Sequence, residues 1–232
     1  MHNGDRQYLK TIFQPFGQTE ADEPLESEQR EIDILFTPDP EKAPAANHLG
    51  LLGRLAATPA AFEFFSHPVK PHEISNSLVK ILDLNEELEG NATEENRTLT
   101  EAELAHLWIF TPTASAAVLA DFGATLDLEN WMSGIYFLPK GLLSAIIVIH
   151  ELPPTPETLC LRILGMGEVR KQALQELSQL PPEHPIRSTA LKLLEQFRTS
   201  LETQPDLSPE EKEFLMELSP LDSQPLVPEE WS

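Results

Sequence analysis

A single carboxylate interrupts an apolar segment near the N-terminus of the chain. Residues 31–37 read EIDILFT, a β-branched and apolar pattern that predicts a strand ending before Pro38, and Asp33 stands in its middle. Burying a carboxylate is costly unless a metal ion, a cation or backbone N–H groups compensate its charge. Asp33 therefore either lies on an exposed strand face or beside a cation such as Arg30, or it belongs to a metal site. The sequence leaves these alternatives open.

The other chemically active residue types carry no recognisable motif. The chain has no GxxxxGK[ST], GxGxxG, HExxH or GxSxG sequence, and its seven histidines lack metal-ligand spacing. Cys160 is the only cysteine, which excludes an internal disulfide and a cysteine-based zinc site, and its apolar surroundings predict a packed core thiol. His150 and Glu151 follow a predicted strand, where side chains either project into a cleft or meet solvent.

The chain is strongly acidic. Among its 232 residues, 38 are Asp or Glu and 16 are Lys or Arg, which gives a formal net charge of −22. Affinity for nucleic acid usually depends on basic residues that neutralise phosphates, so this balance argues against an extended nucleic-acid-binding face. The densest basic cluster is interleaved with glutamates and predicts a solvated helix surface of mixed charge. Its members are Arg162, Arg170, Lys171, Arg187, Lys192 and Arg198.

The composition predicts a globular cytoplasmic protein. Hydrophobic residues make up 41% of the chain, which is enough to build a core. The longest apolar run, residues 142–149, is far shorter than the ~20 residues of a membrane span. Residues 1–10 contain no apolar segment of the kind found in signal peptides. We therefore expect no membrane partner.

Apolar periodicity and turn residues predict alternating helices and strands. Besides residues 31–37, strands are predicted at 104–111, 134–138 and 144–150, and the last two form a hairpin through Lys140 and Gly141. Residues 17–29 are acidic and polar and are predicted to be a loop. Helices are predicted at 49–66 with a break at Thr58-Pro59, from Pro71 onward, and at 114–122, 157–180, 186–201 and from Ser208.

This order of elements predicts an α/β fold, with a small mixed sheet flanked by helices and a C-terminal helical extension. The proline-rich segment 152–156 is stiff and marks a candidate boundary. The chain is thereby divided into an α/β core at 1–156, a helical extension at 157–221 and a loose acidic tail at 222–232.

Several segments resemble an uncharacterised cyanobacterial family. They are EIDILFTPDP, LGLLGRLAATPAAFEFF, LWIFTPTAS, GIYFLP and AIIVIHELPPTPETLCLRILGMG. The part that begins ETLCLRILGMG and includes EEKEFLMELSPL is similar to the helical tail of Rpn-like (recombination-promoting nuclease/putative transposase) proteins, which belong to the PD-(D/E)XK nuclease superfamily. The resemblance covers about residues 30–221 and implies a restriction-endonuclease-like core.

The resemblance implies a particular metal chemistry. Enzymes of this superfamily use an Asp on one strand and an acid two residues before a Lys on the next, and the carboxylates hold one or two Mg²⁺ ions that polarise the phosphate. Asp33 corresponds to the first Asp, as a catalytic residue and metal ligand. No predicted strand carries the acid-x-Lys pattern. Glu73 and Lys80, two turns apart on the helix predicted to begin at Pro71, are therefore the candidates for a relocated acid and lysine.

Two functions are compatible with these observations. The missing acid-x-Lys pattern and the net charge of −22 favour a degenerate, catalytically inactive nuclease-like fold that acts as a protein-interaction module, through a protein partner or self-association. The alternative is a divergent Mg²⁺-dependent DNA endonuclease that uses Asp33 and binds nucleic acid. A second carboxylate within about 4 Å of Asp33 and a positive groove beside it would favour the enzyme.

Overall fold

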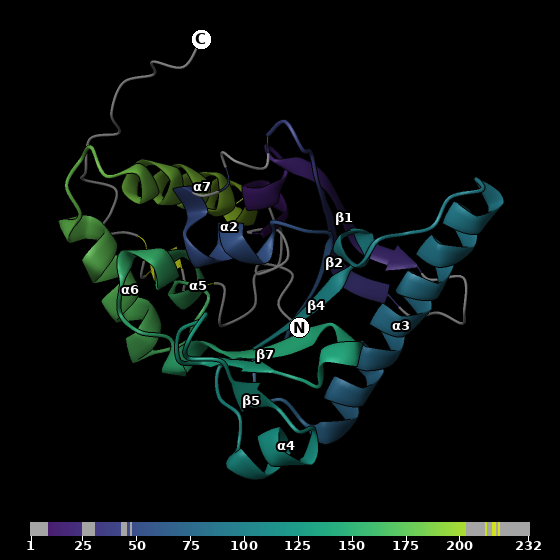
Figure 1. Ribbon diagram of the computed structural model, residues 1–232. Coiled ribbons are helices and arrows are strands. Elements are labelled where there is room, and N and C mark those ends of the chain that lie inside the picture. The colour runs from purple at the N-terminus through teal and green to yellow at the C-terminus, as the bar shows by residue number, and fades with distance from the viewer. Residues whose placement is uncertain are drawn as a thin grey trace.

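The protein has the expected α/β fold, in which a mixed seven-stranded sheet is flanked by helices and followed by a helical region (Figure 1). The computed structural model describes residues 9–24, 31–42, 46, 48–202, 212, 215–216 and 218. The strands, in spatial order, are β1 (Gly17–Pro24), β2 (Glu31–Pro38), β3 (Ala60–Phe64), β4 (His106–Thr111), β7 (Ser144–Val148), β6 (Ile135–Phe137) and β5 (Thr125–Leu126).

The sheet has three parts that differ in strand direction. Strands β1, β2 and β3 pair antiparallel, β3, β4 and β7 pair parallel, and β7, β6 and β5 pair antiparallel. Because parallel neighbours need a crossover connection, helix α3 (Pro71–Glu94) links β3 to β4. Every residue of β3 and β7 is buried, as expected for strands covered on both faces.

The two faces of the sheet carry separate hydrophobic cores. On one face, α3 and α4 (Ala116–Asp121) contribute Ile81 and Leu119 to a core that includes Ile109 of β4. The opposite face is covered by α2 (Leu51–Leu55), α5 (Leu159–Arg162), α6 (Glu168–Gln179) and α7 (Pro185–Glu202), as Figure 1 shows. The helices that follow residue 156 thus share a core with the sheet.

Most sequence-predicted elements are confirmed, but the loop predicted at 17–29 is wrong. Residues 17–24 form strand β1, which pairs with β2 from Gly17 opposite Pro38 to Pro24 opposite Glu31. An edge strand can be held by backbone hydrogen bonds to a single neighbour. Because such a strand does not need apolar side chains at alternate positions, its polar sequence does not identify it as a strand. The predicted helix start at Ser208 and the tail 222–232 lie outside the described residues.

The helix predicted at 49–66 is also wrong, because only α2 is helical there and β3 follows it. The sequence Ala-Ala-Phe-Glu-Phe of β3 is short and mostly apolar, and periodicity cannot separate such a run from a buried helix turn. Residues 60–64 form a strand because they are buried between the layers that cover the two faces of the sheet. The rings of Phe62 and Phe64 each stack on Phe110 of β4, with centroids 6.0 and 4.4 Å apart.

Helix α3 begins at Pro71 as predicted, and it is held at its first turn and again at Asn85 in its second half. The carboxylate of Glu73 accepts the backbone N–H of Lys70 at 2.8 Å, which caps the first turn. Further along, the side-chain amide of Asn85 both accepts from and donates to the backbone of Ala105, just before β4. Leu82 lies on the outer side of the helix and is 50% exposed. The inner face is formed by Ile74, Ser77, Ile81 and Leu84.

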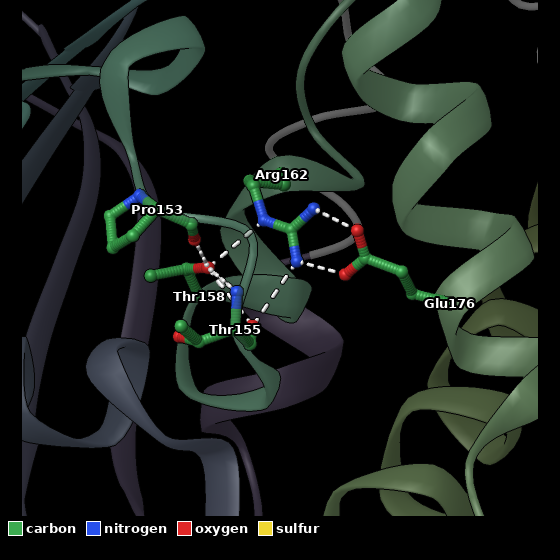
Figure 2. A network of polar contacts seen from close by, with 5 residues as sticks. All are labelled: Pro153, Thr155, Thr158, Arg162 and Glu176. Atoms are coloured by element: carbon green, nitrogen blue, oxygen red, sulfur yellow. Dashed lines mark hydrogen bonds and ion pairs between the residues drawn. The ribbon is translucent and has the colours of Figure 1, made fainter.

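Two members of the basic cluster, Arg162 and Arg187, are buried, contrary to the predicted solvated surface. Arg162 of α5 is 2% exposed, and its guanidinium donates to the hydroxyl of Thr158, the carbonyl of Thr155 and the carboxylate of Glu176 on α6. Figure 2 shows the guanidinium between the turn at Pro153–Thr158 and α6. These contacts fix α6 against the segment through which the chain leaves the sheet.

Candidate functional site

Two buried acidic residues lie at neighbouring positions on strands β2 and β3. The register pairs Ile34 with Phe62 and Leu35 with Ala61, and continuing it by one residue sets Asp33 opposite Glu63. Asp33 is 4% exposed and Glu63 is 3% exposed. Of the alternatives left open for Asp33, an exposed strand face is therefore wrong. Arg30, the suggested pairing cation, lies outside the described residues.

Each carboxylate accepts a backbone N–H from the other strand. Oδ2 of Asp33 accepts the N–H of Phe64 at 3.0 Å, and Oε1 of Glu63 accepts the N–H of Asp33 at 3.4 Å. Backbone donors of this kind stabilise a buried carboxylate and hold it in one orientation. The two acids are therefore held in place as a pair by the strands that carry them.

Lys80 of α3 supplies the positive charge next to this pair. Its Nζ lies 2.8 Å from Oε1 and 2.9 Å from Oε2 of Glu63, so the ammonium engages both oxygens. The Lys80 side chain is 18% exposed and that of Glu63 is 4% exposed. When all three are ionised, Asp33, Glu63 and Lys80 together carry one net negative charge, and Lys80 is the member of this triad nearest to solvent.

The pKa of Glu63 reflects this environment. Burial, followed by the negative charge of Asp33, raises the pKa of the Glu63 carboxyl to about 7, although the ammonium of Lys80 opposes the rise. A glutamate that titrates near neutral pH beside a second acid is typical of functional sites, although structural ion pairs show the same behaviour.

Glu73, the other acid predicted for the site, lies elsewhere on α3. It precedes Lys80 by seven residues, which is about 10 Å along the helix axis. Its carboxylate contacts His67 Nε2 at 2.8 Å as well as the N–H of Lys70. Burial would raise the pKa of Glu73, but these two hydrogen bonds bring it below its ordinary value. Its contacts are those of a helix cap and a surface ion pair.

The sequence analysis missed Glu63, which takes the place expected of the second acid. The error follows from assigning β3 to a helix, because the acid then had no strand context. The signal that singled out Asp33 also applies to Glu63, since each is a lone acid within a short apolar run. The residue two places after Glu63 is Phe65, so the acid-x-Lys spacing is absent and the lysine comes from α3 instead.

Two other predicted positions have ordinary explanations. Cys160 is a buried core thiol as predicted, and burial raises its pKa to about 12, so it is unreactive. His150 and Glu151 are exposed beyond the end of β7, where Glu151 accepts the phenol hydroxyl of Tyr136. That hydrogen bond raises the pKa of Tyr136 to about 12.

The donor set of Asp33 and Glu63 fits a hard cation. Mg²⁺ prefers oxygen ligands and commonly uses one or two carboxylates, with water and substrate phosphate completing its shell. Within the described part of the chain, no group of three or more His, Cys, Asp or Glu residues could hold a metal ion. This excludes a closed, all-protein cage among those residues and is compatible with a two-carboxylate Mg²⁺ site.

Comparison with known proteins finds no matching family model, curated protein or solved structure. Among the described residues, no helix combines the length and apolar character needed to cross a membrane. The function of this chain is therefore inferred from the residues of the site itself.

Proposed function

We propose that this protein is a divergent Mg²⁺-dependent nuclease whose active site consists of Asp33, Glu63 and Lys80. The observation that carries the proposal is the pairing of two buried carboxylates on adjacent strands with a lysine bound to one of them. Asp on one strand and an acid on the next is the arrangement implied by the superfamily resemblance. Lys80 does not follow Glu63 by two residues, as the acid-x-Lys pattern requires, but its ammonium still contacts the Glu63 carboxylate.

Each residue has a distinct part in this proposal. Asp33 and Glu63 hold the ion, and Lys80 orients the attacking water or contacts the phosphate. When bound, Mg²⁺ supplies charge stabilisation of the phosphate and an activated water. The backbone N–H groups of Asp33 and Phe64 keep the two carboxylates oriented, so that little reorganisation is needed on binding.

Two features favour a second candidate, an inactive protein-interaction module. The carboxylates are almost fully buried, and Glu63 is already neutralised by Lys80. A net charge of −22 also opposes a polyanionic substrate. In an enzyme, substrate would have to enter from the side of Lys80, and the metal ion would have to provide most of the local positive charge.

The Glu63→Gln variant separates these candidates by activity. Fluorescent single- and double-stranded DNA and RNA oligonucleotides would be incubated with the wild type, with Glu63→Gln and with Glu129→Gln, an exposed control. We expect Mg²⁺-dependent cleavage by the wild type and the control. Cleavage by Glu63→Gln should fall at least about a hundredfold, because a metal ligand is lost from the site that stabilises transition-state charge.

Two results would contradict the nuclease. One is cleavage that persists in EDTA, and the other is a Glu63→Gln variant as active as the wild type. If no substrate is cleaved at all, the interaction module is favoured, and light scattering coupled to size-exclusion chromatography then tests self-association.

A further inference from the structure

The Glu63 carboxylate has two potential partners, the ammonium of Lys80 and a metal ion, that would compete for its oxygens. Both of its oxygens contact the ammonium of Lys80, at 2.8 and 2.9 Å. A bound Mg²⁺ would need at least one of them at about 2.1 Å. We propose that Lys80 competes with the metal ion: it occupies Glu63 in the metal-free protein and leaves Glu63 when metal binds. This inference rests on the proposed function and adds how its site is regulated.

Distance makes joint occupancy unfavourable. An ion about 2.1 Å from a Glu63 oxygen would lie within about 5 Å of an ammonium that remained 2.8 Å from the same oxygen. A divalent ion and an ammonium repel each other strongly at that separation, and the repulsion is larger where both are shielded from water. Because Glu63 is only 3% exposed, solvent cannot screen them effectively.

Charge balance points to exchange rather than addition. When both carboxylates and the ammonium are ionised, the three side chains carry one net negative charge. Adding a divalent ion while Lys80 stays would change this to one net positive charge. If Lys80 leaves, the two carboxylates and the divalent ion are neutral together. A buried site favours the compensated arrangement.

The Lys80 ammonium can also move away from Glu63 without any movement of helix α3. The Lys80 side chain is 18% exposed, and a lysine can extend its four-carbon stem so that the charge reaches water. Helix α3 is held independently by Glu73 at its N-terminus and by Asn85 against Ala105. A change of side-chain conformation is therefore sufficient, and it frees the ammonium for the phosphate or the attacking water.

The test compares metal affinity in the full chain by titration calorimetry with Mn²⁺. We expect Lys80→Met to bind Mn²⁺ about tenfold or more tightly than the wild type, because the competing cation is gone. Lys171→Met, which removes an exposed lysine on α6 and changes net charge equally, should bind like the wild type. Lys80→Gln provides a second variant if Lys80→Met does not fold.

A second measurement uses the wild type alone. The rate at which an N-hydroxysuccinimide ester acylates Lys80, followed by mass spectrometry, should rise when Mg²⁺ is added, whereas acylation of Lys171 should not change. Equal or weaker Mn²⁺ affinity in both Lys80 variants, or unchanged acylation of Lys80 in a wild type that binds metal, overturns the competition and leaves the nuclease proposal standing. If neither the wild type nor the variants bind metal, both proposals fail.

Discussion

Glu176→Gln is expected to lower the free energy of unfolding by about 2–3 kcal/mol. The substitution leaves the guanidinium of Arg162, which is 2% exposed, without its counter-charge. Removing one partner of a fully buried ion pair costs about 3–5 kcal/mol, and the cost is lower here because Glu176 is 27% exposed, so that water can partly replace its carboxylate. The contacts of Arg162 with Thr155 and Thr158 remain, but neither of them carries a negative charge.

Urea denaturation followed by circular dichroism measures this effect. Glu195→Gln is the matched control, since its partner Arg198 lies three residues away on the same helix and the pair is partly exposed. We expect that control to change stability by no more than about 1 kcal/mol. Adding Arg162→Met to Glu176→Gln should recover part of the loss, because no buried charge then remains. A double variant less stable than Glu176→Gln alone would contradict this explanation.

The second large effect is a fall in stability as pH rises toward neutrality, caused by Glu63. Its pKa is raised from 4.5 to about 7 in the folded protein, chiefly by burial and then by Asp33. Below pH 4.5 the folded and unfolded states both hold the proton. Between pH 4.5 and 7 the unfolded chain releases it first, so the contribution of Glu63 to stability is lost over that window. The expected loss is up to about 3 kcal/mol.

Glu63→Gln isolates this contribution, because other carboxylates titrate in both proteins. We subtract the unfolding free energy of Glu63→Gln from that of the wild type at each pH. This difference should decrease from pH 5 to pH 7. The exposed control Glu129→Gln should show no such trend. A difference that grows in favour of the wild type with rising pH would mean that the Lys80 ion pair outweighs burial, and would contradict the assignment.

The sequence predicted those elements whose side-chain pattern matches their burial. Strands β2, β4 and β6 were found because their apolar runs end at prolines, β7 because its run is apolar throughout its middle, and helix α3 because apolar residues recur at helical spacing after Pro71. Strand β1 was missed because its stability comes from backbone pairing at an edge, which leaves no apolar pattern. Strand β3 was missed because a five-residue apolar run gives helix and strand equal support until the layers on both sides are known.

The same limits apply to the candidate site. Asp33 was identified because a lone acid in an apolar strand needs a partner, and Lys80 because its helix was recognised. Glu63 could not be identified as a site residue once β3 was assigned to a helix. Its position opposite Asp33 follows from strand register, which depends on long-range pairing rather than local sequence. Glu73 was placed correctly on α3, but its contacts with His67 and Lys70 come from the loop that precedes the helix.

The central claim is that Asp33 and Glu63 together bind a divalent cation, and Mn²⁺ calorimetry on four proteins tests it most directly. We predict one site per chain in the wild type, its loss in both Asp33→Asn and Glu63→Gln, and its retention in Glu73→Gln, whose carboxylate caps the first turn of α3 and bonds to neither acid in the structure. Equal, weak binding in all four proteins would contradict the claim, because it would reflect only the general attraction of a chain with a net charge of −22.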